Sequence, residues 1–220
     1  MTLDIALLAA RLESAVYAAG GERAGASTFA DLLARYRESH RCYHTLEHID
    51  ACLVWLDWYR GVAESSAQIE LAIWYHDAVY DPSAHDNESR SAQLCRAQLF
   101  ALGVGETTID RVARHIQATQ RHAATSGDSR LVVDLDLTIL GAVPHAFDRF
   151  EAQIRAKYAH IPDALFAAGR SAVLQRFLAK PALFQTAAIR EQLEQSARDN
   201  LERRIAELAN TLADTHPGPT

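Results

Sequence analysis

The residues best suited to chemistry in this sequence are His76 and Asp77, which stand side by side near the end of a strongly apolar run. With helical spacing, His76 falls on a face with Ile69, Ile73 and Tyr80 that otherwise has the composition of a protein core. Asp77 lies about 100° further round the helix. An imidazole and a carboxylate on or beside an apolar face need a polar partner, and a metal ion would satisfy both. The pair therefore predicts part of a metal site whose other ligands come from elsewhere in the chain.

A second His-Asp pair, His85-Asp86, follows a Pro-Ser turn and precedes a predicted helix. Aspartate is a preferred residue at a helix N-cap, because its side chain accepts hydrogen bonds from the first backbone N–H groups. We therefore interpret Asp86 as a helix cap.

Two further histidines, His44 and His48, stand at positions i and i+4, which share one face of a helix. His48 also shares a stripe with Cys52 and Tyr59, an apolar surface where a solvated imidazole would be out of place. Taken alone, His48 is either a buried structural histidine or a metal ligand. Because the His-Asp pair is present in the same chain, we predict a metal ligand.

Residues 131–140 offer two carboxylates, Asp134 and Asp136, within an apolar stretch. On a helix these two side chains point about 200° apart, so one metal cannot easily take both. Asp136 shares its face with Val132 and Ile139, whereas Asp134 lies on a more mixed face. A carboxylate on a drier face has the greater need of a cation. We predict Asp136 as the ligand and keep Asp134 as the alternative.

Mixed imidazole and carboxylate ligands suit Mn²⁺, Fe²⁺, Co²⁺, Ni²⁺ or Mg²⁺ and leave open positions for water and a substrate. Such a metal activates its water as a nucleophile, and Asp77 is placed to bind the metal and to orient that water. A structural zinc site would require four protein ligands, usually including cysteine. None of Cys42, Cys52 and Cys95 has the spacing for such a site. The ligand set therefore favours catalysis with a divalent metal.

The order His48, His76-Asp77, Asp136 resembles the H…HD…D signature of the HD-domain superfamily of metal-dependent phosphohydrolases. The resemblance is carried by residues 43–49, 74–81 and 134–141, is closest to a compact bacterial branch of that superfamily, and spans most of residues 36–178. It implies an α-helical fold, a divalent metal and hydrolysis of a phosphate ester. The ligands that it implies are His48, His76, Asp77 and Asp136.

Four further residues are candidates for a role at this site. The Tyr-His-x-x-x-His spacing is similar to the start of the cyclic-nucleotide phosphodiesterase site, which implies that His44 is a general acid. Some HD proteins place further histidines on a later helix to hold a second metal or the phosphate, which implies a site role for His122 and, less directly, for His115. Glu88 is either a base near the site or a residue that supports the start of its helix.

Binding of phosphate by a chain of net charge −6 requires local cations. Arg41, Lys157 and Arg170 lie within residues 36–178, most of which the resemblance spans, so we predict that they bind the substrate. Solvated surface charge is the alternative for each.

Three functions are compatible with these residues. The first is a phosphohydrolase that acts on a small phosphorylated metabolite, with a nucleotide as the leading candidate. The second is a non-catalytic sensor that keeps the metal pocket to bind a nucleotide. The third is a di-iron oxygenase, which would need additional ligands such as His115, His122 and Glu88 to converge.

The elements that must position these residues are nearly all helical in pattern. Helices are expected at about 3–18, 27–39, 45–61, 65–77, 87–102, 107–122, 144–158, 162–178 and 187–213, with a loop at 123–130. We predict an all-α fold, namely one HD-type helical domain over residues 1–214, with its core at about 36–178. The apolar stripe of the last helix is either packed on this bundle or a homodimer seam. Residues 215–220 are expected to be disordered.

Composition limits the remaining possibilities. A chain of 220 residues can bury a large core as one domain. The 22 basic and 28 acidic residues argue against binding of a nucleic-acid polymer or a membrane surface. Charged residues interrupt the apolar pattern of the first twenty positions, unlike a signal peptide. Three cysteines without a C-x-x-C pair indicate reduced thiols, so we expect a cytoplasmic protein.

Overall fold

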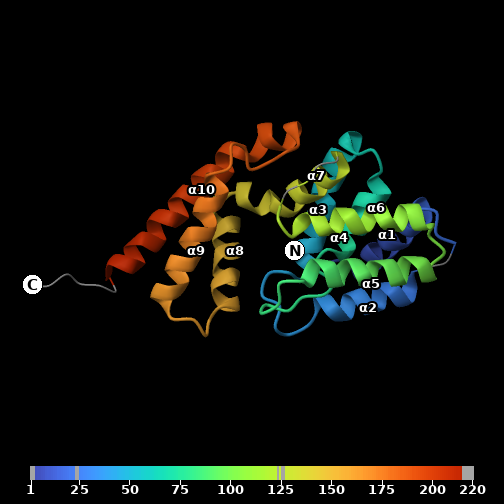
Figure 1. Cartoon of the computed structure of the whole chain (residues 1–220), viewed down its shortest axis with the longest axis horizontal. Coiled ribbons are helices and arrows are strands. Elements are labelled where there is room, and N and C mark those ends of the chain that lie inside the picture. The colour runs from blue at the N-terminus through green and yellow to red at the C-terminus, as the bar shows by residue number, and fades with distance from the viewer. Residues whose placement is uncertain (1–2, 23–24, 123, 125–126, 215–220) are drawn as a thin grey trace, which may run out of the picture. The chain divides into compact units, whose positions relative to one another are not determined.

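The computed structural model describes residues 3–22, 25–122, 124 and 127–214 (Figure 1). Every regular element within these ranges is helical, which confirms the predicted all-α fold. The α-helices are α1 (Ile5–Ala18), α2 (Ala26–Tyr36), α3 (Leu46–Tyr59), α4 (Ser66–Tyr75), α5 (Asn87–Ala101), α6 (Glu106–Thr119), α7 (Gly127–Asp136), α8 (Pro144–Lys157), α9 (Asp163–Leu178) and α10 (Ala187–Asp214), and the 3₁₀ helices are η1 (Arg60–Val62) and η2 (Leu137–Gly141). No helix in the described ranges combines the length and hydrophobicity of a membrane span.

Most helix boundaries agree with the sequence pattern, and Thr45, Ser65 and Asp86 occupy the N-cap positions of α3, α4 and α5. The largest difference is α7, which begins at Gly127 inside the predicted loop. Its first turn is polar in sequence, yet Asp128 is buried because its carboxylate accepts hydrogen bonds from the backbone N–H groups of residues 64 and 65, at 2.8 and 2.9 Å. This contact between distant segments has no signature in local periodicity.

The chain divides into two compact units, a first unit up to Asp136 and a second unit from Leu137 onwards. Each is described by itself. The single domain expected over residues 1–214 stays a prediction, and the tail expected to be disordered, residues 215–220, lies outside the described residues.

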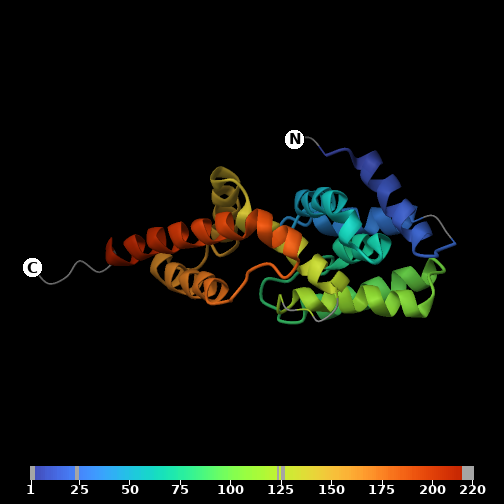
Figure 2. The ribbon, with the colours of Figure 1, turned by 90° about the horizontal axis from the view of Figure 1, so that it is seen from above.

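In the first unit, α4 is the central helix. All residues from Ile69 to Tyr75 are buried, and α4 contacts α1, α3, α5, α6 and α7. Helices α5 and α6 lie side by side (Figure 1), and in the view of Figure 2 they overlap. Apart from Glu70, the stretch from Ile69 to Tyr75 is apolar on every side, and a helix of that kind must be buried on all sides. The chain that leaves the C-terminus of α4, at His76, therefore starts from the interior of the unit.

One buried charge on α4, the Glu70 carboxylate, is balanced by two guanidinium groups. Glu70 is 3% exposed and accepts hydrogen bonds from Arg11 Nε at 2.9 Å and from Arg60 at 3.0 Å. Arg11 also donates to the carbonyl of Leu53 at 3.0 Å and pairs with Asp57 at 2.7 Å. The Arg11 side chain therefore joins α1 to both α3 and α4.

Arg11→Ala is expected to lower the free energy of unfolding by about 3 kcal/mol, because removing one partner of a buried ion pair leaves the other poorly compensated. The measurement is urea denaturation followed by circular dichroism. Arg35→Ala is the control, since Arg35 pairs with Asp31 at the surface, where such pairs contribute about 0–1 kcal/mol. Equal effects of the two substitutions would contradict the prediction.

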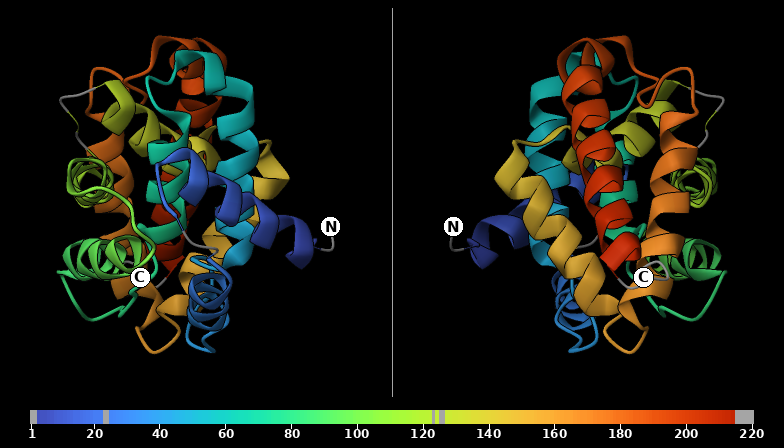
Figure 3. Two further views of the ribbon diagram at one scale, coloured as in Figure 1. Left: turned by 90° about the vertical axis from the view of Figure 1, so that its right-hand side faces the viewer. Right: turned by 90° about the vertical axis from the view of Figure 1, so that its left-hand side faces the viewer.

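The second unit packs α10 against α9 and η2 (Figure 3). Gly141, at the end of η2, permits the close approach of α10. A Cβ atom at Gly141 would lie 2.7 Å from the Leu193 Cβ and 2.9 Å from the Leu193 carbonyl oxygen. The backbone oxygen cannot rotate out of the way, so α10 would have to shift.

Gly141→Ala is expected to destabilise the second unit by about 1–3 kcal/mol, the usual cost of overpacking. Gly169→Ala should have the opposite effect. Gly169 lies inside α9, where an added Cβ would meet nothing within 4 Å, and alanine is favoured over glycine in helices by about 1 kcal/mol. Thermal unfolding of the two variants should shift in opposite directions; a shift of the same sign would show that this account of the packing is wrong.

Candidate metal centre

The predicted ligands come from helix ends that meet in the first unit. His48 lies in the first turn of α3, His76 is the C-cap of α4, Asp77 follows it in a turn, and Asp136 is the last residue of α7. Helices α3, α4 and α7 contact one another in pairs. Their mutual packing therefore brings the three segments to one place.

The donor atoms of His48, His76 and Asp136 all lie within 4.8 Å of one another, close enough to share one cation. His48 Nε2 lies 3.2 Å from His76 Nε2 and 3.2 Å from Asp136 Oδ1. Asp77 Oδ2 lies 3.1 Å from His76 Nε2 and 3.6 Å from His48 Nε2. Ligands bound at about 2.1 Å are separated by roughly 3.0 Å at right angles and 3.4 Å at tetrahedral angles. His48, His76 and Asp136 could hold a metal ion, and Asp77 contacts both imidazoles.

The His76 ring is oriented as a metal ligand requires. Its Nδ1 lies 2.9 Å from the carbonyl oxygen of Ile73, which can only accept a hydrogen bond. In the neutral ring the proton is therefore on Nδ1, and the lone pair of Nε2 faces the other donor atoms. A backbone carbonyl that fixes the tautomer in this way is a common feature of metal-bound histidines.

Cys52 packs behind His48 without being a candidate ligand. Its Sγ lies 3.8 Å from His48 Nδ1 and donates to the carbonyl of Leu135, at 3.7 Å. Burial raises the pKa of the Cys52 thiol well above its usual value, so the thiol stays protonated. The shared stripe of His48 and Cys52 was visible in the sequence, but the contact with α7 was not.

The charges in the cluster favour two anionic carboxylates. Burial alone raises the pKa of Asp136, but hydrogen bonds from His122, His48 and His76 hold it well below its usual value. Burial also tends to raise the pKa of Asp77, but the nearby imidazoles, above all that of His76, lower it below its usual value. Burial lowers the pKa of His76, yet the two carboxylates outweigh it and raise that pKa well above its usual value. The two carboxylates therefore favour a proton on His76 when no cation is bound.

Metal binding is expected to release about one proton near pH 7, because the cation displaces the proton that the raised pKa keeps on His76. The apparent affinity should therefore fall as the pH falls. Calorimetric titration in two buffers of different ionisation enthalpy measures the release. Identical heats in both buffers would contradict this expectation.

The predicted general acid, His44, lies beside the cluster. Its ring centroid is 6.0 Å from that of His48 and 4.6 Å from that of Tyr80, and the residue is half-buried. His44 thus borders the ligands without joining them.

His122 contacts the cluster from a position beyond the end of α6, which the sequence did not predict. Helix α6 ends at Thr119, so His122 lies beyond the helix that was expected to continue to about residue 122. His122 has φ = 46°, an uncommon conformation for a residue other than glycine. Its Nε2 lies 3.4 Å from Asp136 Oδ2. The two carboxylate oxygens of Asp136 therefore have different partners: Oδ1 faces His48 and His76, and Oδ2 faces His122.

Two other candidates are not drawn into the cluster. His115 is buried on α6, where its Nδ1 lies 2.8 Å from Ser129 Oγ, and burial lowers its pKa. Glu88 lies in the first turn of α5, and among the described residues no ion pair joins it to the ligands. Of the three additional ligands expected for a di-iron site, His122 contacts the cluster, whereas among the described residues no ion pair or hydrogen bond joins His115 or Glu88 to it.

The predicted substrate-binding cations have other partners. Arg41 is buried, and its guanidinium is hydrogen-bonded to backbone carbonyls and to Glu38. Lys157 and Arg170 belong to the second unit, where they line a cavity of about 420 Å³. There Arg170 pairs with Glu151, and Lys157 Nζ lies 5.1 Å from the centroid of the Tyr158 ring. Their role in substrate binding stays a prediction.

The structure brings Asp136 to the cluster and not Asp134, although the argument for this choice was wrong. Asp134 has no exposed surface, whereas the Asp136 side chain is 17% exposed. Asp136 is thus the wetter of the two carboxylates, and its place at the end of α7 makes it available to a ligand.

In comparisons with protein families, curated proteins and solved structures, nothing matches this chain.

Proposed function

We propose that this protein is a divalent-metal-dependent phosphohydrolase that acts on a small phosphorylated metabolite, with nucleotides as the first candidates. The observation that carries the proposal is the meeting of two imidazole Nε2 atoms, 3.2 Å apart, with carboxylate oxygens of Asp77 and Asp136 in one buried cluster. The resemblance of these residues, in this order, to the HD-domain signature supports hydrolysis of a phosphate ester.

The donor set suits a catalytic cation better than a structural one. His48, His76, Asp77 and Asp136 would hold it, and mixed nitrogen and oxygen ligands of this kind suit Mn²⁺, Fe²⁺, Co²⁺, Ni²⁺ or Mg²⁺. A closed structural zinc site usually includes thiolates, whereas the pKa of Cys52 is raised by burial. When bound, the cation lowers the pKa of a coordinated water and draws charge from phosphoryl oxygens.

The surrounding residues supply the proton transfers. The lowered pKa of Asp77 keeps its carboxylate anionic, so it can orient the attacking water and accept its hydrogen bond. His44, half-buried beside the ligands, is suited to donate a proton to the leaving oxygen. His122 contacts Oδ2 of Asp136 and so helps to orient this carboxylate.

The test is a phosphate-release screen of the purified protein with each of the five metals against mononucleotides, cyclic nucleotides and sugar phosphates. The proposal expects release that disappears under chelator and returns with metal. Full activity of the metal-stripped protein under chelator would overturn it. So would thermal stabilisation by a nucleotide without any phosphate release across the panel, which is the behaviour of a sensor.

A further inference from the structure

Arg41 lies between the two segments that carry His48 and His76-Asp77. Its guanidinium donates to the carbonyl of His44 at 3.0 Å, to the carbonyl of Asp77 at 2.8 Å, and to the carbonyl of Ala78 at 3.2 Å. The first acceptor immediately precedes Thr45, the N-cap of α3, and the other two follow the C-terminus of α4. One side chain thus joins the entry of α3 to the exit of α4.

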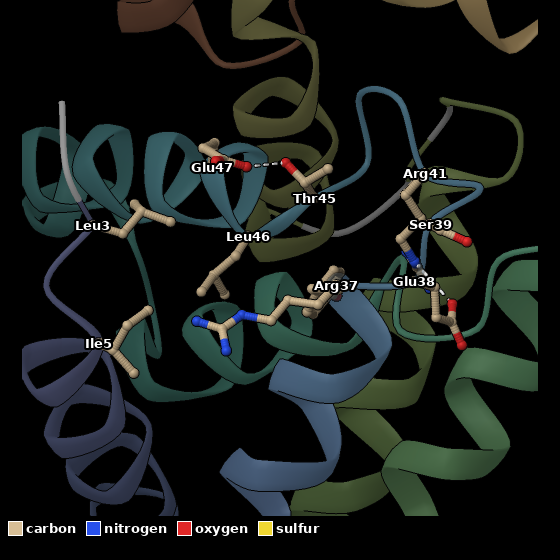
Figure 4. Close-up of a pocket in the computed structure, with 10 residues that line it drawn as sticks. Leu3, Ile5, Arg37, Glu38, Ser39, Arg41, Thr45, Leu46 and Glu47 are labelled. Atoms are coloured by element: carbon tan, nitrogen blue, oxygen red, sulfur yellow. Dashed lines mark hydrogen bonds and ion pairs between the residues drawn. The ribbon is translucent and has the colours of Figure 1, made fainter.

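The groups around Arg41 hold the plane of its guanidinium in one orientation. The side chain has no exposed surface, and Nε pairs with Glu38 at 3.0 Å, a contact in the wall of a cavity of about 670 Å³ (Figure 4). The rings of Tyr36 and Tyr80 lie 5.1 and 5.2 Å from the guanidinium carbon. A guanidinium has five N–H groups, and four of them are used in these hydrogen bonds. Most of the hydrogen-bond donors of the Arg41 guanidinium are therefore used within the protein.

This placement has a physical reason. The last carbonyl groups of a helix have no partner within the helix and carry partial negative charge. The carbonyls of Asp77 and Ala78 lie in the turn just beyond the C-cap of α4, and the guanidinium of Arg41 supplies their hydrogen-bond donors. The planar fork reaches several carbonyls at once, which the single ammonium of lysine does not reproduce.

We propose that Arg41 is a positioning residue of the metal centre, which fixes the backbone of Asp77 relative to the start of α3 and so sets the separation of the ligands. This inference rests on the proposed metal site. It assigns Arg41 to the support of the ligands in place of the phosphate contact expected from the sequence.

The test compares the affinity for Mn²⁺, measured by electron paramagnetic resonance of the free ion, in the wild type, Arg41→Ala, Arg41→Lys and Arg11→Ala. Loss of a residue that orients metal ligands typically costs about 10–100-fold in affinity. Both Arg41 variants should show a loss of this size, and low millimolar guanidinium should restore part of it in Arg41→Ala. Arg11→Ala is the matched control, because Arg11 also joins helices through a backbone carbonyl and a buried carboxylate, yet contacts no ligand.

Unchanged affinity in folded Arg41→Ala and Arg41→Lys would overturn the inference, as would an equal loss in Arg11→Ala. Failure of both Arg41 variants to fold, judged by circular dichroism, would also overturn it, because the residue would then serve the fold as a whole. A wild type that binds no Mn²⁺ or other divalent metal would instead contradict the metal site on which the inference depends.

Discussion

Asp77→Asn is expected to reduce metal-dependent phosphate release by about a thousandfold, within the range observed when a group that handles the reacting proton is lost. The substitution keeps the shape of the side chain and removes the negative charge that lies 3.1 Å from His76 Nε2. The cation is then held less tightly, and the attacking water loses its anionic hydrogen-bond partner. Initial rates at saturating metal separate the second effect from the first.

The second His-Asp pair of the chain provides the control for this experiment. Asp86 has the same preceding residue, but its carboxylate is 65% exposed at the start of α5. Asp86→Asn should leave the rate unchanged. If Asp77→Asn and Asp86→Asn retained similar activity, Asp77 would have no part in the reaction.

The second large effect concerns metal affinity itself. His48→Ala, His76→Ala and Asp136→Asn are each expected to weaken binding more than 100-fold, because replacement of a residue that merely supports a ligand already costs about 10–100-fold. Equilibrium dialysis with metal analysis gives the stoichiometry and the affinity. Far-UV circular dichroism should show that the helical content is retained.

Asp134, the other carboxylate near the end of α7, provides the control for Asp136→Asn. Asp134 is fully buried, so Asp134→Asn should lower stability while one equivalent of metal still binds to the folded protein. Loss of metal from Asp134→Asn and its retention in Asp136→Asn would reverse the assignment of the ligand.

The sequence predicted the helices well because their periodicity and caps are local properties. The pair His76-Asp77 was recognisable for a related reason, since polar groups at the end of the apolar run of α4 required a partner. The choice between Asp134 and Asp136 was harder. It depended on which carboxylate lies at the end of α7. The start of that helix is held by hydrogen bonds between Asp128 and a distant segment, which the local sequence does not reveal.

Residues whose role depends on tertiary contacts could not be assigned from spacing. Arg41 was expected at a phosphate, and only the packing of α3 against α4 shows that its donors are used by backbone carbonyls. His122 reached Asp136 because α6 ends early and the backbone turns to a positive φ. Neither event has a signal in the hydrophobic pattern.

Anomalous diffraction from crystals of the protein grown with Mn²⁺ tests the central claim most directly. The account predicts one strong peak within about 2.3 Å of His48 Nε2, His76 Nε2, Asp77 Oδ2 and Asp136 Oδ1, a normal bond length for such ligands. Data free of an anomalous peak at these four side chains, from crystals in which they are well ordered, would contradict it.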